Sequence, residues 1–126
     1  EKSYSLRVPA SQLSNLQTYI PDNIDGANLP YVHNSIVNKV VNIVEEYGLT
    51  VTGALRDEKK NAFTKGSAEN SLHQYGFSTD HRYNTNAKKL LAFAEANPSQ
   101  LPAMGINNIF KHTVDGVPHL HIDYNS

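Results

Sequence analysis

The sequence contains no cysteine and no long hydrophobic run. Without cysteine the chain can form neither a disulfide framework nor a thiolate zinc site, and it has no cysteine nucleophile. A transmembrane helix needs about 18 or more apolar residues in succession, so we expect no membrane partner. The first ten residues also lack the apolar segment of a signal peptide. Any metal ligands must therefore come from the six histidines and the 12 acidic residues.

Charge is scarce as well. Charged residues make up 18% of the chain and the formal net charge is -1, which gives no broad basic field to attract nucleic acid. We therefore expect no nucleic-acid partner, and nothing in the composition indicates a protein partner. The 126 residues, of which 39% are hydrophobic, suffice for one globular domain with a single core.

Hydrophobic periodicity predicts a single α+β domain in which a small antiparallel sheet is flanked by helices. Residues 1–30 are expected to be an irregular N-terminal segment of that domain, apart from a short helix that Ser11 could cap, and residues 31–126 are expected to form its core. The predicted core begins with a helix from about residue 31 to 47 that ends at Gly48, followed by a strand over 49–56 and a surface loop over 57–72. A strand within 73–83 comes next, and then a helix over 86–96 that is capped by Asn86 and ended by Asn97 and Pro98. The last predicted element is a hairpin of 106–114 with 117–124 that turns at Asp115 and Gly116.

Two short segments carry the residues suited to metal chemistry. The first is SLHQYGFSTD, residues 71–80, and the second is PHLHIDY, residues 118–124. If the second segment is a strand, then His119, His121 and Asp123 share one face, because side chains alternate along a strand. One of the two histidines could then bind a metal ion while the other meets a substrate.

A catalytic zinc ion typically has three protein ligands and one open position. His73, Asp80 and His121 would supply the three ligands. Gly76 lies between the first two and would let the backbone turn so that both side chains reach one ion. A zinc ion held in this way lowers the pKa of water towards about 7 and polarises a scissile carbonyl. The sequence therefore predicts one zinc ion per chain.

The remaining candidates have ordinary explanations. An isolated histidine is usually a surface or hydrogen-bonded residue, and that is the expectation for His33, His81 and His112. Asp123 is more readily explained as a strand-end acid or as a partner of a ligand than as a ligand itself. Ser71 could simply cap a turn. An H-x-H pair alone is weak evidence of a metal site, so it is the combination of the two segments that carries the prediction.

Both segments resemble motifs of a known family. The pattern S-x-H-x-x-G-x-x-x-D in residues 71–80 is similar to the signature of the M15 zinc peptidases, the group of D-alanyl-D-alanine carboxypeptidases and phage endolysins. The segment HLHID, residues 119–123, resembles the last-ligand strand of that family and the H-x-H motif of the wider group that contains lysostaphin and the murein endopeptidases. Residues 52–57, TGALRD, resemble the arginine-bearing strand of M15 enzymes. The resemblance covers roughly residues 40–124.

The resemblance implies a zinc metallopeptidase that hydrolyses a stem-peptide or cross-link amide bond of bacterial peptidoglycan through a metal-activated water. The three ligands named above take the metal positions of the family. His119 becomes the general base or a donor to the transition state, Arg56 a contact to the substrate or the oxyanion, and Ser71 a contact to the substrate. Such an enzyme would act at the bacterial cell wall or in the periplasm, outside the cell, or as part of a phage.

The sequence departs from the family pattern at the base. Many M15 members carry an acidic base three residues before the last ligand, where this chain has Pro118. Either His119 replaces that carboxylate, or an acid from elsewhere does, such as Asp115, Asp57 or Glu69. The bond that is cut, and the choice between carboxypeptidase and endopeptidase, stay open.

Two other functional classes share parts of the pattern. A non-catalytic zinc-binding module on the same fold would keep the ligands without a base. A His-hydrophobic-His nuclease would need a tyrosine nucleophile, typically on a helix after the motif, whereas Tyr124 lies within the predicted strand itself. Cleavage of purified peptidoglycan would distinguish a peptidase from both of these classes.

Overall fold

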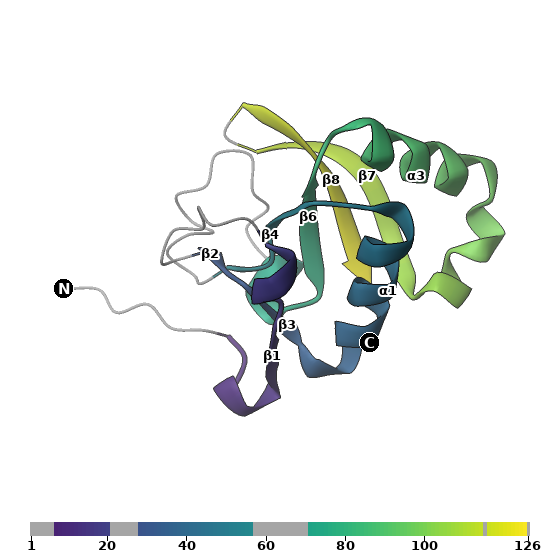
Figure 1. The fold of residues 1–126 in the computed structure, drawn as a ribbon. Coiled ribbons are helices and arrows are strands. Elements are labelled where there is room, and N and C mark those ends of the chain that lie inside the picture. Colours follow the sequence, from purple (N-terminus) through teal and green to yellow (C-terminus); the bar gives the residue numbers. More distant parts are fainter. Residues whose placement is uncertain (1–6, 21–27, 57–70, 115, 126) are drawn as a thin grey trace.

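Four antiparallel strands form the central sheet of the computed structural model (Figure 1). The structure describes residues 7–20, 28–56, 71–114 and 116–125. Across the sheet the strands follow the order β4 (Val51–Gly53), β6 (Ser78–Arg82), β8 (Val117–Tyr124) and β7 (Ile106–Val114). The middle strands, β6 and β8, come from the two segments with the metal motifs, so the sheet itself brings those motifs side by side.

Two helices, α1 (Val37–Tyr47) and α3 (Thr85–Ala96), cover one face of this sheet (Figure 1). Their apolar side chains recur at helical spacing, and burial of each large one stabilises the fold by about 1.5–3 kcal/mol relative to exposure. The helices and β8 share one hydrophobic core, which includes Val40, Ile43 and Val44 from α1, Ala87 and Leu90 from α3, and Leu120 and Ile122 from β8.

The local sequence explains where the two helices begin and end. α1 ends at Gly48, which adopts a left-handed φ of 65° that glycine accepts without a steric penalty. α3 begins after Asn84, whose side-chain oxygen accepts a hydrogen bond from the backbone N–H of Ala87. The predicted ends of both helices, at Gly48 and at Asn97 with Pro98, are confirmed.

Two further pairs of short strands are antiparallel. β1 (Leu13–Asn15) pairs with β3 (Tyr31–His33), and β2 (Asn28–Leu29) pairs with β5 (Leu55–Arg56). Short 3-10 helices complete the described elements: η1 (Ala10–Gln12), η2 (Gln17–Tyr19), η3 (Asn34–Ile36), η4 (Leu72–Tyr75), η5 (Pro98–Gln100) and η6 (Pro102–Met104).

The two faces of the sheet differ in chemistry. On β8, the side chains of Leu120, Ile122 and Tyr124 join the core beneath the helices. The alternate residues of β8 point to the opposite face, as do their partners on β6, because residues directly opposite each other in an antiparallel pair lie on the same side. That polar face carries Ser78, Asp80 and Arg82 from β6, and His119, His121 and Asp123 from β8.

The predicted α+β class, with helices on an antiparallel sheet, is confirmed. The C-terminal hairpin is also confirmed, with strands at residues 106–114 and 117–124. Gly116 has the positive φ expected at its turn, 79°. Asp115 lies outside the described residues, as does most of the predicted surface loop, residues 57–70.

Two helix predictions near the N-terminus are wrong. Ser11 caps no helix towards Ile20, because the segment forms η1, β1 and η2 instead. The helix expected from about residue 31 begins only at Val37, and Tyr31–His33 form β3. Hydrogen bonds between β1 and β3 outweigh a local helix preference that is weak in any case.

The other differences from the sequence predictions are local. Asn84 caps α3 in place of Asn86, whose Nδ2 donates instead to Gly48 O at 3.1 Å. The strand predicted within residues 73–83 is confirmed as β6, and His73 precedes it in the 3-10 turn η4. The strand predicted over residues 49–56 is present as β4 and β5, with an interruption at Ala54.

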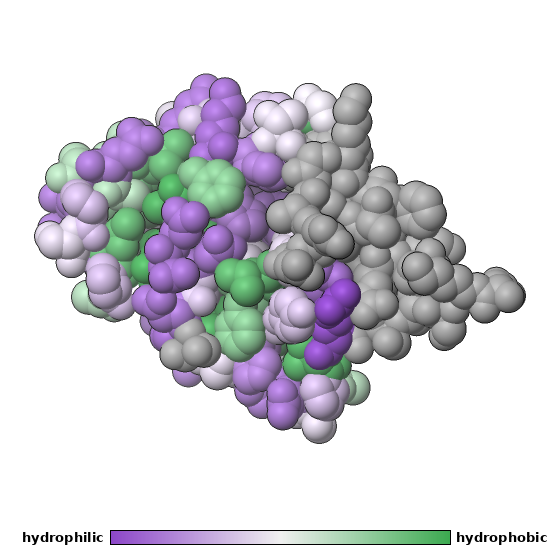
Figure 2. All heavy atoms as spheres, turned by 180° about the vertical axis from the view of Figure 1, so that it is seen from behind, coloured by the Kyte–Doolittle hydropathy of each residue, from purple (hydrophilic) through white to green (hydrophobic). Residues whose placement is uncertain are grey.

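The surface of the described chain is mixed in character. Figure 2 shows small groups of hydrophobic side chains set among hydrophilic ones on the face opposite to the view of Figure 1. Among the described residues, the exposed large hydrophobic side chains are those of Leu72 and Val117. Within the described ranges, no helix is both long enough and apolar enough to cross a bilayer.

The turn after η4 depends on a glycine. Gly76 and Gly116 have nearly the same left-handed φ, 81° and 79°, but different surroundings. A Cβ on Gly76 would lie 2.6 Å from the backbone nitrogen of His33, whereas one on Gly116 would meet nothing within 4 Å. The His33 N–H donates to Gly76 O at 2.9 Å, so β3 and the turn approach each other closely.

We expect Gly76→Ala to destabilise the protein more than Gly116→Ala does. Both variants incur the cost of a left-handed alanine, about 1–2 kcal/mol. Only Gly76→Ala also forces β3 away from the turn, which adds about 1–3 kcal/mol. Urea denaturation of the two variants measures the difference, and equal losses of stability would show that the close approach to His33 is not a constraint.

Candidate metal centre

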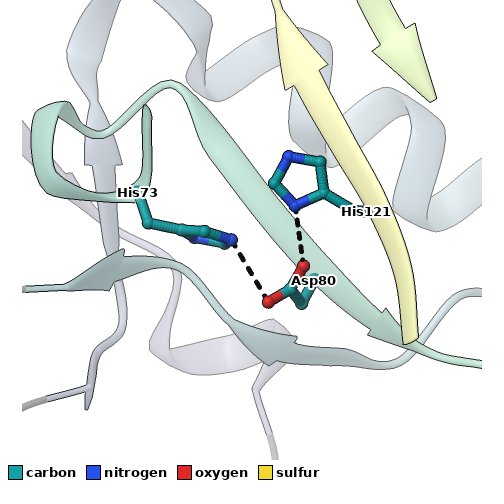
Figure 3. A group of neighbouring side chains, drawn as sticks. All are labelled: His73, Asp80 and His121. Atoms are coloured by element: carbon teal, nitrogen blue, oxygen red, sulfur yellow. Dashed lines mark hydrogen bonds and ion pairs between the residues drawn. The ribbon is translucent and has the colours of Figure 1, made fainter. Parts of the chain in front are cut away.

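Three side chains from separate elements converge on the polar face of the sheet (Figure 3). His73 comes from η4, Asp80 from β6 and His121 from β8, and all three are buried. One nitrogen or oxygen atom from each lies within 4.8 Å of the others. These are the three residues that the sequence predicts as metal ligands, so the cluster can bind a metal ion.

His73 is held so that one nitrogen faces the cluster. The Ser71 hydroxyl accepts a hydrogen bond from the His73 backbone N–H at 3.2 Å and caps η4. The ring nitrogen Nδ1 lies 2.8 Å from the carbonyl oxygen of Ala54. Because a carbonyl oxygen can only accept, Nδ1 carries the proton and Nε2 presents a lone pair in the neutral ring.

The lone pair of His73 Nε2 faces a carboxylate. Nε2 lies 3.2 Å from Asp80 Oδ2, but it is buried and makes no hydrogen bond within the described part of the chain. The two atoms are therefore close enough for a hydrogen bond, but their relative orientation does not allow one. Two electron-rich atoms at this distance need a cation between them, which is either a proton or a metal ion.

Asp80 is the centre of the cluster. Its Oδ1 accepts a hydrogen bond from His121 Nδ1 at 3.0 Å, and its Oδ2 lies 3.7 Å from a guanidinium nitrogen of Arg56. Burial alone would raise the pKa of Asp80, but the nearby imidazoles of His73 and His121, together with the hydrogen bond from His121, outweigh burial and hold the pKa well below its usual range. The carboxyl group is therefore ionised and available as a ligand.

His121 lies between two carboxylates. Its Nδ1 donates to Asp80, and its Nε2 donates to Asp123 Oδ1 at 2.6 Å. Ser78 also donates to Asp123 Oδ1. Burial would lower the pKa of His121, but the hydrogen bonds to Asp123 and Asp80 raise it to about 9. A metal ion would replace the proton on Nδ1, while Nε2–H keeps its bond to Asp123, as in carboxylate–histidine–metal arrangements.

The spacing of the donor atoms fits a small divalent ion. Ligands at about 2.0–2.2 Å from a tetrahedral ion are about 3.3–3.5 Å apart. His73 Nε2 lies 3.2 Å from Asp80 Oδ2, and His121 Nδ1 lies 3.0 Å from the other oxygen, Oδ1. One ligand atom from each of the three residues lies within 4.8 Å of the others. The three groups would have to draw closer together around a bound ion, and Nε2 of His73 and Nδ1 of His121 are the ring atoms that face the carboxylate.

The structure also places the other residues predicted for the site. His119 is half-buried on the same face of β8 as His121, and its Nδ1 lies 3.0 Å from Thr52 Oγ1. Arg56 is buried against Asp80, and Ser71 caps the turn that carries His73. A contact of Arg56, Ser71 or His119 with a substrate stays a prediction. The alternative acids Asp57, Glu69 and Asp115 lie outside the described residues.

Three residues beside the cluster are not among the site residues predicted from the sequence. Phe110 pairs with His121 across β7 and β8, and their ring centroids are 4.8 Å apart. His112 pairs with His119, and its ring centroid is 6.0 Å from that of His121. Ser78 holds Asp123. The places of Phe110 and His112 opposite His121 and His119 could have been predicted from the sequence, because the turn of the predicted hairpin sets the register between its strands.

The two remaining histidines singled out from the sequence lie away from the cluster. His33 stacks on Phe77 with ring centroids 4.8 Å apart. His81 is fully buried beneath the helices, where its Nε2 lies 2.7 Å from Thr79 Oγ1. Their expected roles as surface or hydrogen-bonded residues agree with these contacts.

Comparison of the chain with protein-family models, with curated proteins and with solved structures gives no match. The case for a function therefore rests on the site geometry and on the motif resemblance.

In the metal-free protein we expect stability to fall as pH rises from about 6.5 to 9. The folded state raises the pKa of His121 from 6.5 to about 9, so this contribution is complete below pH 6.5 and is lost as pH passes through about 9. The loss is on the order of a few kcal/mol, because one pKa unit corresponds to about 1.4 kcal/mol. Burial lowers the pKa of His81 to about 4, so that residue is neutral throughout this window.

Urea denaturation in the presence of a chelator measures this pH dependence. The variant Asp123→Asn is the matched comparison, because it removes one of the two carboxylates that retain the proton on His121. Its decline in stability should be smaller and should end at a lower pH. The same decline in both proteins would show that Asp123 does not hold that proton.

Proposed function

We propose that this chain is a zinc-dependent peptidase that cleaves a peptide amide bond in bacterial peptidoglycan. The observation that carries the proposal is that the three residues aligned with the M15 ligand positions meet in one buried cluster, although they come from three separate elements. In that cluster a buried histidine lone pair faces an ionised carboxylate, which favours a bound cation. Peptidoglycan as the substrate follows from the motif resemblance.

Zinc is the proposed ion because the donor set is two imidazoles and one carboxylate, without sulfur. When bound, zinc polarises a scissile carbonyl and lowers the pKa of water. Three protein ligands leave one coordination position for reactants, as in other catalytic sites. Asp123 keeps His121 oriented towards Asp80 and increases its basicity as a ligand.

His119 is the proposed general base. It lies two residues from His121 on the same face of β8, and Thr52 holds its Nδ1 at 3.0 Å. With Nδ1–H directed at the threonine hydroxyl, Nε2 can accept a proton from the attacking water and later donate it to the leaving amine. Pro118 occupies the position of the usual acidic base, so a histidine one residue later takes over that task.

Arg56 and Ser71 have contacts that suit positioning roles. The Arg56 guanidinium lies 3.7 Å from Asp80 Oδ2, so the attraction between their opposite charges helps to hold this ligand in place. The Ser71 hydroxyl fixes η4 and thereby His73. Both residues are also proposed to contact the substrate, Arg56 at the oxyanion and Ser71 at the peptide backbone.

The nuclease alternative is disfavoured by the position of Tyr124. This residue is only 3% exposed and lies in the core on the face opposite to His121. Its hydroxyl is 2.8 Å from Thr79 Oγ1, and burial raises the pKa of the phenol, so it is not a nucleophile for the metal cluster. A non-catalytic zinc-binding module remains as an outcome of the test below.

The test is digestion of purified peptidoglycan by the zinc-loaded protein. We expect soluble fragments with new amino and carboxyl termini, which chromatography and mass spectrometry would identify. A chelator should abolish the reaction and added zinc should restore it. If the wild-type protein binds one zinc ion but releases no fragment and no amino acid, the chain is a non-catalytic module.

In the same assay, His119→Ala should retain its zinc and its circular dichroism spectrum but lose about 10²- to 10⁴-fold in rate, because a general base is removed. His33→Gln, which changes a histidine of β3 stacked on Phe77, serves as the control and should keep full activity. Full activity of zinc-bound His119→Ala would place the base elsewhere. Loss of zinc from His119→Ala, with retention by His121→Ala, would make His119 the ligand.

A further inference from the structure

The polar face carries a second pair of histidines next to the metal cluster. His112 on β7 and His119 on β8 are direct partners in the hairpin register. Residues directly opposite each other in an antiparallel pair have Cβ atoms about 4.5–5.5 Å apart and lie on the same face. We propose that His112 and His119 form a second binding site for a divalent transition-metal ion, two residues along the hairpin from the pair of Phe110 and His121.

The orientation of His119 suits this role. Its Nδ1 is engaged by Thr52 Oγ1 at 3.0 Å, so Nε2 is the nitrogen left to bind an ion. Ligating histidines commonly donate their other ring N–H to a nearby oxygen, which fixes the ring and the tautomer. Thr52 comes from β4 and supplies such an oxygen here.

The position of His112 suits it as well. Its ring packs edge-on against Phe110, with centroids 5.7 Å apart and an interplanar angle of 88°, and lies 6.0 Å from the ring of His121. Phe110 in turn packs on His121 at 4.8 Å. The His112 ring is therefore held over the polar face, beside the first cluster. Both His112 and His119 are half-buried, so an ion can reach them from solvent.

The chemistry of the pair selects the ion. Two imidazoles without a carboxylate favour late first-row metals such as zinc or copper(II) over magnesium or calcium, which prefer oxygen ligands. The second site should bind more weakly than the first, because it offers two neutral protein ligands where the first offers three ligands with one negative charge. It fills when the metal is in excess.

Occupation of this site has a consequence for activity, which rests on the proposed function. An ion on His119 Nε2 occupies the lone pair that would accept the proton from water. Excess zinc should therefore inhibit the peptidase, and His112→Ala should be less sensitive to that inhibition. The binding test itself needs no substrate, so its failure is distinguishable from a failure of the proposed function.

In the experiment, the metal-free full chain is titrated with Zn²⁺ in a calorimeter, and equilibrium dialysis with metal analysis gives the number of ions bound. The wild-type protein should bind one zinc ion tightly and a second more weakly. His112→Ala should bind one only. The control is Lys111→Ala, which changes the neighbouring residue of β7 on the other face of the sheet, and it should bind two.

His119→Ala provides a second variant, which should also lose the weak site. If both histidine variants lose their circular dichroism spectrum, His112→Asn, which preserves polarity at that position, takes their place. Binding of a single zinc ion by the wild-type protein overturns the proposal. So does a second site that survives in His112→Ala or His112→Asn.

Discussion

The hydrogen bond between His73 Nδ1 and the carbonyl oxygen of Ala54 determines the character of the site. It fixes the proton on the nitrogen that points away from the cluster, so that Nε2 directs a lone pair at the Asp80 carboxylate. Without a cation this arrangement leaves a buried acceptor without a partner, which costs about 1–3 kcal/mol. The turn that holds His73 in place depends in turn on Ser71 as its cap and on Gly76 at its end.

The sheet separates this chemistry from the core. Alternation along β6 and β8 directs one set of residues to the helices and the other set to the polar face, so the ligands Asp80 and His121 are held by the same backbone that buries Leu120 and Ile122. The central strands therefore fix the backbone positions of both ligands, and the hydrogen bonds of His121 to Asp80 and Asp123 orient the side chains. The rigidity of the site thus comes from the packing of the core, which suits a centre that must hold its ligands before an ion arrives.

The sequence predicted the parts of this account that depend on local spacing. Alternation in residues 117–124 placed His119, His121 and Asp123 on one face, and the motif paired His73 with Asp80 across a glycine. It did not predict that His73 lies in a 3-10 turn, nor that β1 pairs with β3 where a helix was expected, because both depend on contacts between distant segments. The same holds for the contact of Arg56 with Asp80 and for the approach of Phe110 and His112 to the cluster.

The central claim is that His73, Asp80 and His121 bind one metal ion, and a crystal structure of the zinc-loaded protein tests it most directly. Anomalous scattering measured on either side of the zinc absorption edge locates the ion independently of the refined atoms. We expect one strong peak about 2.0–2.2 Å from His73 Nε2, an Asp80 oxygen and His121 Nδ1. The absence of a peak among these three side chains, or a strong peak ligated by His119 in place of His121, would contradict the account.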